Sequence, residues 1–175
     1  LGVSDVRFLS LPDGAGYETD ELVRSLARVV GDVQPEVLFA PDPFVRGECH
    51  EDHLRVGRAA RQIACFAPYP GIMESYGASA APVRAICLYM TASPNRYVAT
   101  GSYLDRQLRS IFDCHLSQYP PGCPDAASIR TYLKLRSIDF GLRSLKGHAE
   151  GFRMLDALHM HCLPEAGEQC LPEAG

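Results

Sequence analysis

Two histidines and two carboxylates lie close together in residues 49–53, Cys-His-Glu-Asp-His. A histidine can bind a divalent metal ion or donate a proton near neutral pH, and a neighbouring carboxylate can hold its ring in the required tautomer. The segment therefore indicates a metal-dependent hydrolase loop. It differs from the zincin helix motif, because His50 and His53 are three residues apart rather than four. A pair of solvated histidines on a polar loop is the alternative.

The histidine segment lies between a predicted strand and a predicted helix. Residues 37–40 form a short apolar run that ends at Pro41-Asp42-Pro43, a pattern typical of a strand covered on both faces in a parallel sheet. From about His53 to Phe66 the apolar residues recur with helical spacing. Ligands of open α/β sheets bind at the loops that follow the strands, so this position favours the functional interpretation.

The chain before this segment has the same strand and helix pattern. Residues 6–11 are predicted to form a strand, and residues 12–14, Pro-Asp-Gly, are predicted to form a turn. Thr19 can cap a helix with one apolar stripe, and Gly31 is predicted to end it. Strand, helix and strand therefore alternate before the histidines.

The chain after the segment continues the alternation. Ser102 and Asp105 resemble a capping box for a helix whose apolar stripe runs to His115. The other predicted elements are strands at residues 83–90 and 96–100 and a helix at about residues 126–142. Alternating elements of this length predict an α/β domain with a largely parallel sheet.

Composition narrows the class of protein. With 175 residues and 46% hydrophobic content, the chain can bury one core. A formal charge of -4 gives no basic surface for nucleic acid or an anionic membrane, and no apolar stretch reaches the roughly 20 residues of a membrane span. The seven cysteines, an odd number without paired spacing, favour reduced thiols. We therefore expect a soluble cytoplasmic protein with a small-molecule partner.

The carboxyl-terminal residues contain a direct repeat of Cys-Leu-Pro-Glu-Ala-Gly, at residues 162–167 and 170–175. Two short copies cannot build a solenoid, so residues 154–175 are predicted to form a flexible tail. The neighbouring segment His159-Met160-His161-Cys162 carries metal-binding side chains. A terminus without fixed geometry disfavours a specific metal site there.

Five segments together resemble the LmbE-like, or PIG-L-type, de-N-acetylases. The histidine segment resembles the family's His-Pro-Asp-His signature, which follows a strand and a Pro-Asp-Pro turn. The other matching segments, in chain order, are residues 6–14, 83–94, 115–118 (His-Leu-Ser-Gln) and 148–152 (His-Ala-Glu-Gly-Phe). The resemblance covers roughly residues 1–153, which we predict to form one deacetylase domain. It implies a Rossmann-like three-layer sandwich with a mostly parallel sheet.

The resemblance implies a zinc-dependent hydrolase that removes an acetyl group from an N-acetylglucosaminyl moiety or a related amide. His53 matches the family's zinc-ligating histidine. His50 matches the histidine that stabilises the oxyanion or protonates the leaving amine, and Asp52 matches the carboxylate that orients it. Asp13 and Arg46 are expected to contact the sugar. His115 and Gln118 either line the site or form a helix end that packs on the core. The expected partner is then a small acetylated amino sugar or conjugate. Assembly into a homo-oligomer is left open by the sequence.

Two positions depart from the family pattern. Glu51 replaces a proline, which changes loop stiffness but removes no ligand. The family's first signature, His-Pro-Asp-Asp-Glu, has no match here, although it supplies two zinc ligands and the general base. We therefore expect that a first βα unit of about 30 residues or more is missing before Leu1, and that this chain alone is inactive.

Two alternatives to this interpretation stay open. One is a metal-free carbohydrate-binding remnant that kept the fold and lost the chemistry. The other is an enzyme of the same family that acts on a different amide, such as a thiol-conjugate amidase or an antibiotic-precursor deacetylase. The sequence does not separate these substrates.

Overall fold

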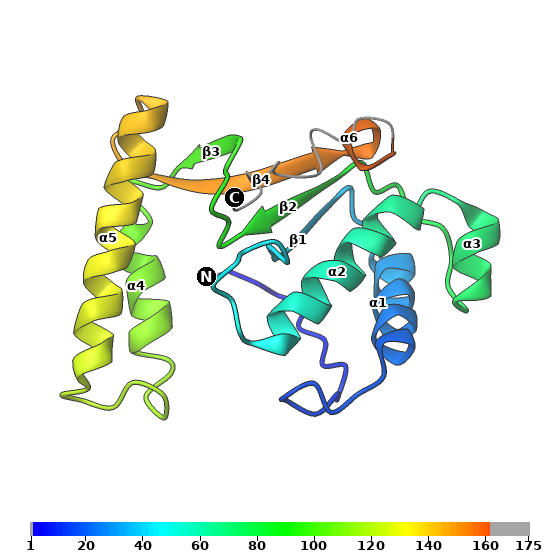
Figure 1. Ribbon diagram of the computed structural model, residues 1–175, viewed down its shortest axis with the longest axis horizontal. Coiled ribbons are helices and arrows are strands. Elements are labelled where there is room, and N and C mark those ends of the chain that lie inside the picture. Colours follow the sequence, from blue (N-terminus) through cyan, green and yellow to red (C-terminus); the bar gives the residue numbers. More distant parts are fainter. Residues whose placement is uncertain (1, 162–175) are drawn as a thin grey trace, which may run out of the picture. The chain divides into compact units, whose positions relative to one another are not determined.

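The structure, a computed structural model, describes residues 2–161 of the chain. Its elements in chain order are shown in Figure 1: α1 (Thr19–Val33), β1 (Val37–Pro41), α2 (Glu51–Phe66), α3 (Pro70–Ser75), β2 (Ala85–Tyr89), β3 (Arg96–Ala99), α4 (Leu104–Phe112), α5 (Pro124–Ser144), β4 (Ala149–Asp156) and α6 (Ala157–His161). None of the helices in residues 2–161 is long and apolar enough to cross a membrane. The described cysteines Cys49, Cys65, Cys114 and Cys123 are free thiols.

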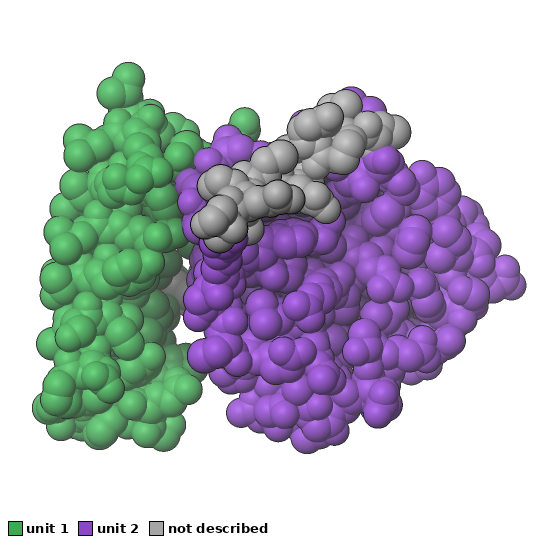
Figure 2. Space-filling view, viewed as in Figure 1, with its two compact units in different colours: residues 1–7, 96–151 green, residues 8–95, 152–175 purple. Residues whose placement is uncertain are grey.

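The chain divides into two compact units, coloured separately in Figure 2. Among the described residues, unit 1 comprises residues 2–7 and 96–151, and unit 2 comprises residues 8–95 and 152–161. The histidine segment belongs to unit 2.

The strands form an open four-stranded sheet in the order β1-β2-β4-β3. β1 runs parallel to β2, with Val37 opposite Ala85, whereas β2 runs antiparallel to β4, with Ala85 opposite Asp156. The predicted α/β class is confirmed, and the sheet is mixed in direction. The sequence analysis did not identify β4 as a strand, because Glu150 and Arg153 interrupt its apolar residues.

The core of unit 2 forms where α1 and α2 cover one face of the sheet. Apolar side chains on the two helices, Leu22, Val23 and Ile63 among them, pack in one cluster with Ile86 and Leu88 of β2. The prediction that β1 is covered on both faces was wrong. β1 lies at the edge of the sheet, and Phe39, which points away from this core, is 61% exposed within the described residues.

Three local predictions in the amino-terminal part of the chain were wrong. Residues 6–11 form no strand, because they pair with no other strand among the described residues; Leu9 and Leu11 instead pack against the core of unit 2. The N-cap residue of α1 is Glu18 rather than Thr19, and the helix continues past Gly31 to Val33. Gly31 has a packing role, since a Cβ there would lie 2.7 Å from the carbonyl oxygen of Ser79.

In unit 1, α4 and α5 pack together through the buried side chains Leu104, Leu108 and Phe112 and the partly buried Ile129 and Leu133. The predicted capping box is wrong, because Tyr103 is the N-cap residue and makes no side-chain cap bond. α4 ends at Phe112, so His115 does not belong to its apolar stripe.

Regular structure continues beyond the predicted domain boundary at residue 153. β4 extends to Asp156 and α6 to His161, so these residues do not form the flexible tail that the sequence predicted. The repeated hexapeptide at residues 162–175 lies outside the described residues.

Candidate functional site

The histidine segment follows the carboxyl end of β1 and opens α2, as the sequence predicted. After β1 ends, the backbone N–H of Asp42 donates to the carbonyl oxygen of Tyr89 at 2.9 Å. The Asp42 carboxylate accepts the backbone N–H of Phe44 at 3.0 Å, which bends the chain away from the sheet. α2 then returns against the end of β1, and a Cβ on Gly57 would lie 2.5 Å from the carbonyl oxygen of Pro41.

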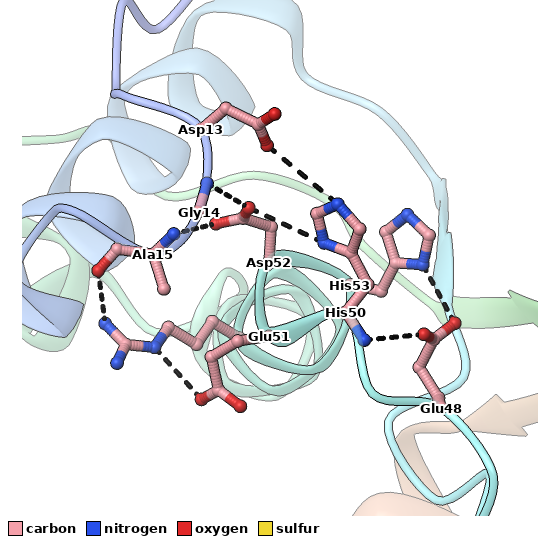
Figure 3. Close-up of polar contacts among 9 residues, drawn as sticks. Asp13, Gly14, Ala15, Glu48, His50, Glu51, Asp52 and His53 are labelled. Atoms are coloured by element: carbon pink, nitrogen blue, oxygen red, sulfur yellow. Dashed lines mark hydrogen bonds and ion pairs between the residues drawn. The ribbon is translucent and has the colours of Figure 1, made fainter. Parts of the chain in front are cut away.

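The two histidine rings are stacked. His50 is the N-cap residue of α2 and His53 lies in its first turn. Their ring centroids are 4.5 Å apart and their planes are 14° from parallel. Both side chains are a little under half exposed, 47% for His50 and 41% for His53. Figure 3 shows that each ring has its own carboxylate neighbours, so the two histidines have different environments.

The Asp52 carboxylate holds the turn at residues 13–15 in place. It accepts the backbone N–H groups of Gly14 at 2.8 Å and Ala15 at 2.9 Å. A hydrogen bond from the Tyr17 hydroxyl and these two backbone bonds lower the pKa of Asp52 to about 2. The same carboxylate lies 3.6 Å from Nδ1 of His50 (Figure 3). Asp52 is therefore charged at neutral pH and holds a distant turn beside His50.

That turn brings Asp13 to the other side of the His50 ring. An oxygen of the Asp13 carboxylate lies 4.0 Å from Nε2 of His50, and the Asp13 side chain is 92% exposed. Ligand atoms of Asp13, His50 and Asp52 all lie within 4.8 Å of one another. Within residues 2–161, these three residues form the one group of His, Cys and acidic side chains with spacing that suits a metal ion, and His53 is not part of it.

Glu48 is a site residue that the sequence analysis missed. Its carboxylate lies 2.9 Å from Nδ1 of His53 and also accepts the backbone N–H of His50 at 2.8 Å. The hydrogen bond with the His53 ring, followed by that from the His50 backbone, holds the pKa of Glu48 below its ordinary value. The sequence did offer a signal for this role, because Glu48 is an acidic residue two positions before the N-cap residue of α2.

An open groove of about 560 Å³ adjoins the Asp13 and Asp52 carboxylates. Its other lining residues are mostly apolar: Phe8, Leu9, Ser10, Leu11, Pro12, Tyr17, Leu22 and Val56. The carboxylates therefore stand at the polar end of an apolar surface, where a ligand of moderate size has room.

The remaining predicted site residues lie elsewhere in the chain. Arg46 is exposed in the loop between β1 and α2. His115 is exposed in the turn after α4, where its carbonyl oxygen accepts the backbone N–H of Gln118 at 3.0 Å. His115 and Gln118 belong to unit 1, whereas the histidine pair belongs to unit 2. Their site roles stay predictions.

Comparison with known proteins shows which family this chain resembles. The family described as PIG-L: GlcNAc-PI de-N-acetylase matches residues 1–64. The chain is 27% identical over 169 residues to a diacetylchitobiose deacetylase of Thermococcus kodakarensis, covering 95% of this chain and 62% of that relative. The chain is therefore similar to the PIG-L-type, or LmbE-like, de-N-acetylases. A second relative, a 1D-myo-inositol 2-acetamido-2-deoxy-alpha-D-glucopyranoside deacetylase of Kineococcus radiotolerans, is 31% identical over 125 residues, covering 56% of this chain and 34% of that relative.

Solved structures agree with this similarity. The N,N'-diacetylchitobiose deacetylase of Pyrococcus horikoshii, solved with an inhibitor, superposes with a TM-score of 0.73 at 27% identity, covering 91% of this chain and 58% of that one. A conserved protein of Thermus thermophilus shares the fold, with a TM-score of 0.60 at 21% identity, covering 81% of this chain and 61% of that one. The chain thus spans about three fifths of the length of these two diacetylchitobiose deacetylases.

Proposed function

We propose that the complete protein is a zinc-dependent hydrolase that removes an acetyl group from an N-acetylglucosaminyl compound or a related amide. The activities named for its relatives, deacetylation of diacetylchitobiose and of an acetamido-deoxyglucoside of inositol, support the reaction class. The observation that carries the proposal is the stacked histidine pair, in which each ring has a separate carboxylate beside it.

His53 is the residue of this chain that would hold zinc. Its Nδ1 is engaged by Glu48, which leaves Nε2 to present a lone pair, the arrangement that metal-ligating histidines commonly have. When bound, zinc polarises a carbonyl group and lowers the pKa of a bound water molecule towards neutrality. The group of Asp13, His50 and Asp52 is less suited, because both Asp52 oxygens already accept backbone hydrogen bonds.

His50 would act on the opposite side of the substrate amide. Carboxylates on both sides, Asp52 at 3.6 Å and Asp13 at 4.0 Å, suit a ring that carries a positive charge. Such a ring can stabilise the oxyanion or give a proton to the leaving amine. Asp52 acts as a positioning residue, since its bonds to Gly14 and Ala15 fix it beside His50. The exposed Asp13 and Arg46 are then available to contact sugar hydroxyl groups.

The two histidine roles predict different losses in the complete protein. His53→Ala should lose most bound zinc together with acetate release. His50→Ala should keep its zinc and lose rate by about 10²–10³-fold, the usual effect of removing one oxyanion donor. Metal content by mass spectrometry and acetate release from a panel of N-acetylglucosaminyl compounds measure both properties.

Other results of this experiment would contradict the assignment. Retention of zinc and activity in His53→Ala would remove His53 from the metal site. Loss of zinc in Asp13→Ala with retention in His53→Ala would instead favour the group of Asp13, His50 and Asp52. Binding of acetylated sugars by the unmodified protein without any acetate release would favour the carbohydrate-binding remnant.

A further inference from the structure

We propose that Glu48 is a positioning residue that fixes the ring tautomer of His53 and connects that ring to the start of α2. This inference rests on the proposed role of His53 as a zinc ligand. The Glu48 carboxylate makes two hydrogen bonds with different tasks. One oxygen lies 2.9 Å from Nδ1 of the His53 ring, and the other accepts the backbone N–H of His50 at 2.8 Å.

The backbone bond stabilises the beginning of the helix. In a capping box, a Glu or Gln three residues into the helix accepts the backbone N–H of the N-cap residue. In α2 that position is occupied by His53 and the N-cap residue is His50. Glu48 supplies the missing acceptor from outside the helix. The backbone N–H of Glu48 donates to the carbonyl oxygen of Val45 at 3.1 Å, which holds the Glu48 backbone in a turn.

The ring bond determines which nitrogen of His53 can bind a metal ion. An ionised carboxylate only accepts hydrogen bonds, so a neutral His53 ring must carry its proton on Nδ1. The lone pair then lies on Nε2, which faces away from Glu48. The Glu48 side chain is 17% exposed, and its two bonds point its oxygens in fixed directions. The carboxylate therefore sets both the orientation and the tautomer of the ring.

The two other carboxylates in the first turn of α2 have partners of their own. The Asp52 oxygens accept the backbone N–H groups of Gly14 and Ala15. Glu51 lies 3.1 Å from the guanidinium of Arg55, on the outside of α2. Glu51 thus offers a matched control, because it has the same chemistry, lies three residues away and makes no contact with either histidine ring in the described structure.

The experiment compares Glu48→Gln with Glu51→Gln in the 175-residue chain labelled with ¹⁵N-histidine. Long-range ¹⁵N–¹H correlation spectra, recorded above about pH 8 where imidazole is neutral, distinguish the two tautomers. The unmodified chain and Glu51→Gln should both show His53 protonated on Nδ1. Glu48→Gln should shift His53 towards the Nε2-protonated form, because a glutamine amide can donate to Nδ1 as well as accept from it, whereas an ionised carboxylate can only accept. Backbone amide spectra of each variant verify that the chain stays folded.

A second measurement separates this inference from the proposed function. In the complete protein, Glu48→Gln should weaken zinc binding by about 10–100-fold, and Glu51→Gln should not. An unchanged His53 tautomer in Glu48→Gln would overturn the positioning role. A changed tautomer with unchanged zinc affinity would leave the positioning role intact and would instead overturn His53 as the zinc ligand. The tautomer measurement needs neither zinc nor substrate, so it stands even if deacetylation fails.

Discussion

The close approach of α2 to the end of β1 holds the histidine segment in place, and Gly57→Ala tests it. A Cβ at position 57 would lie 2.5 Å from the carbonyl oxygen of Pro41 and 2.9 Å from the ring of Pro43. The first distance is about 0.9 Å shorter than the 3.4 Å at which ordinary contact begins. Neither neighbour is a flexible side chain, so the helix itself has to move away from the strand.

The expected magnitude follows from two opposing effects. Replacing glycine by alanine inside a helix ordinarily stabilises it by about 0.5–1 kcal/mol. Overpacking a close contact costs about 1–3 kcal/mol. We therefore expect Gly57→Ala to lower the free energy of unfolding by about 1–2 kcal/mol. For a protein of this size, each kcal/mol corresponds to a decrease in Tm of about 2–4 °C.

Urea unfolding, followed by circular dichroism, measures the effect directly. Gly71→Ala is the matched control, because Gly71 is also helical, lies in the same unit and has no atom within 4 Å of its would-be Cβ. The control should lose no stability. If Gly57→Ala proves as stable as Gly71→Ala, the helix and strand do not approach as closely as the structure indicates.

Two further predictions concern charge and reactivity. Asp52→Asn should be less stable than the unmodified chain at pH 7. The low pKa of Asp52, about 2 in the folded chain against roughly 3.9 in an unfolded one, stabilises the fold above about pH 4, so the difference should shrink as the pH falls towards 2. Thermal unfolding from pH 7 to pH 2 measures this, and a difference independent of pH would contradict it. Burial raises the pKa of the Cys65 thiol, so Cys65 should be alkylated by iodoacetamide more slowly than the exposed Cys49, as followed by mass spectrometry. Equal rates would show that Cys65 is not shielded.

Local patterns in the sequence were sufficient to place the histidine segment. The apolar run before Pro41 and the helical spacing up to Phe66 predicted the strand and the helix on either side of it, and both are present. These features depend on residues a few positions apart, because side chains alternate along a strand and recur every 3.6 residues along a helix. The similarity to the family was predictable for the same reason, since its motifs are short and contiguous.

Other features depended on segments that are distant in the sequence. Residues 6–11 have the composition of a strand, but a strand also needs a neighbour with free backbone groups, and they have none among the described residues. β4 has charged residues within it and still forms a strand, because β2 offers it an antiparallel edge. Composition alone could not distinguish the two cases.

The site likewise combines features set by local sequence with features set by contacts between distant segments. The sequence determined that two histidines and three carboxylates lie within six residues of one another at the start of a helix. Only the tertiary structure assigned the carboxylates to their partners, Glu48 to the His53 ring and Asp52 to backbone groups 37 and 38 residues away. Side-chain type fixes which bonds a residue can make, whereas the approach of distant backbone decides which of those bonds are formed.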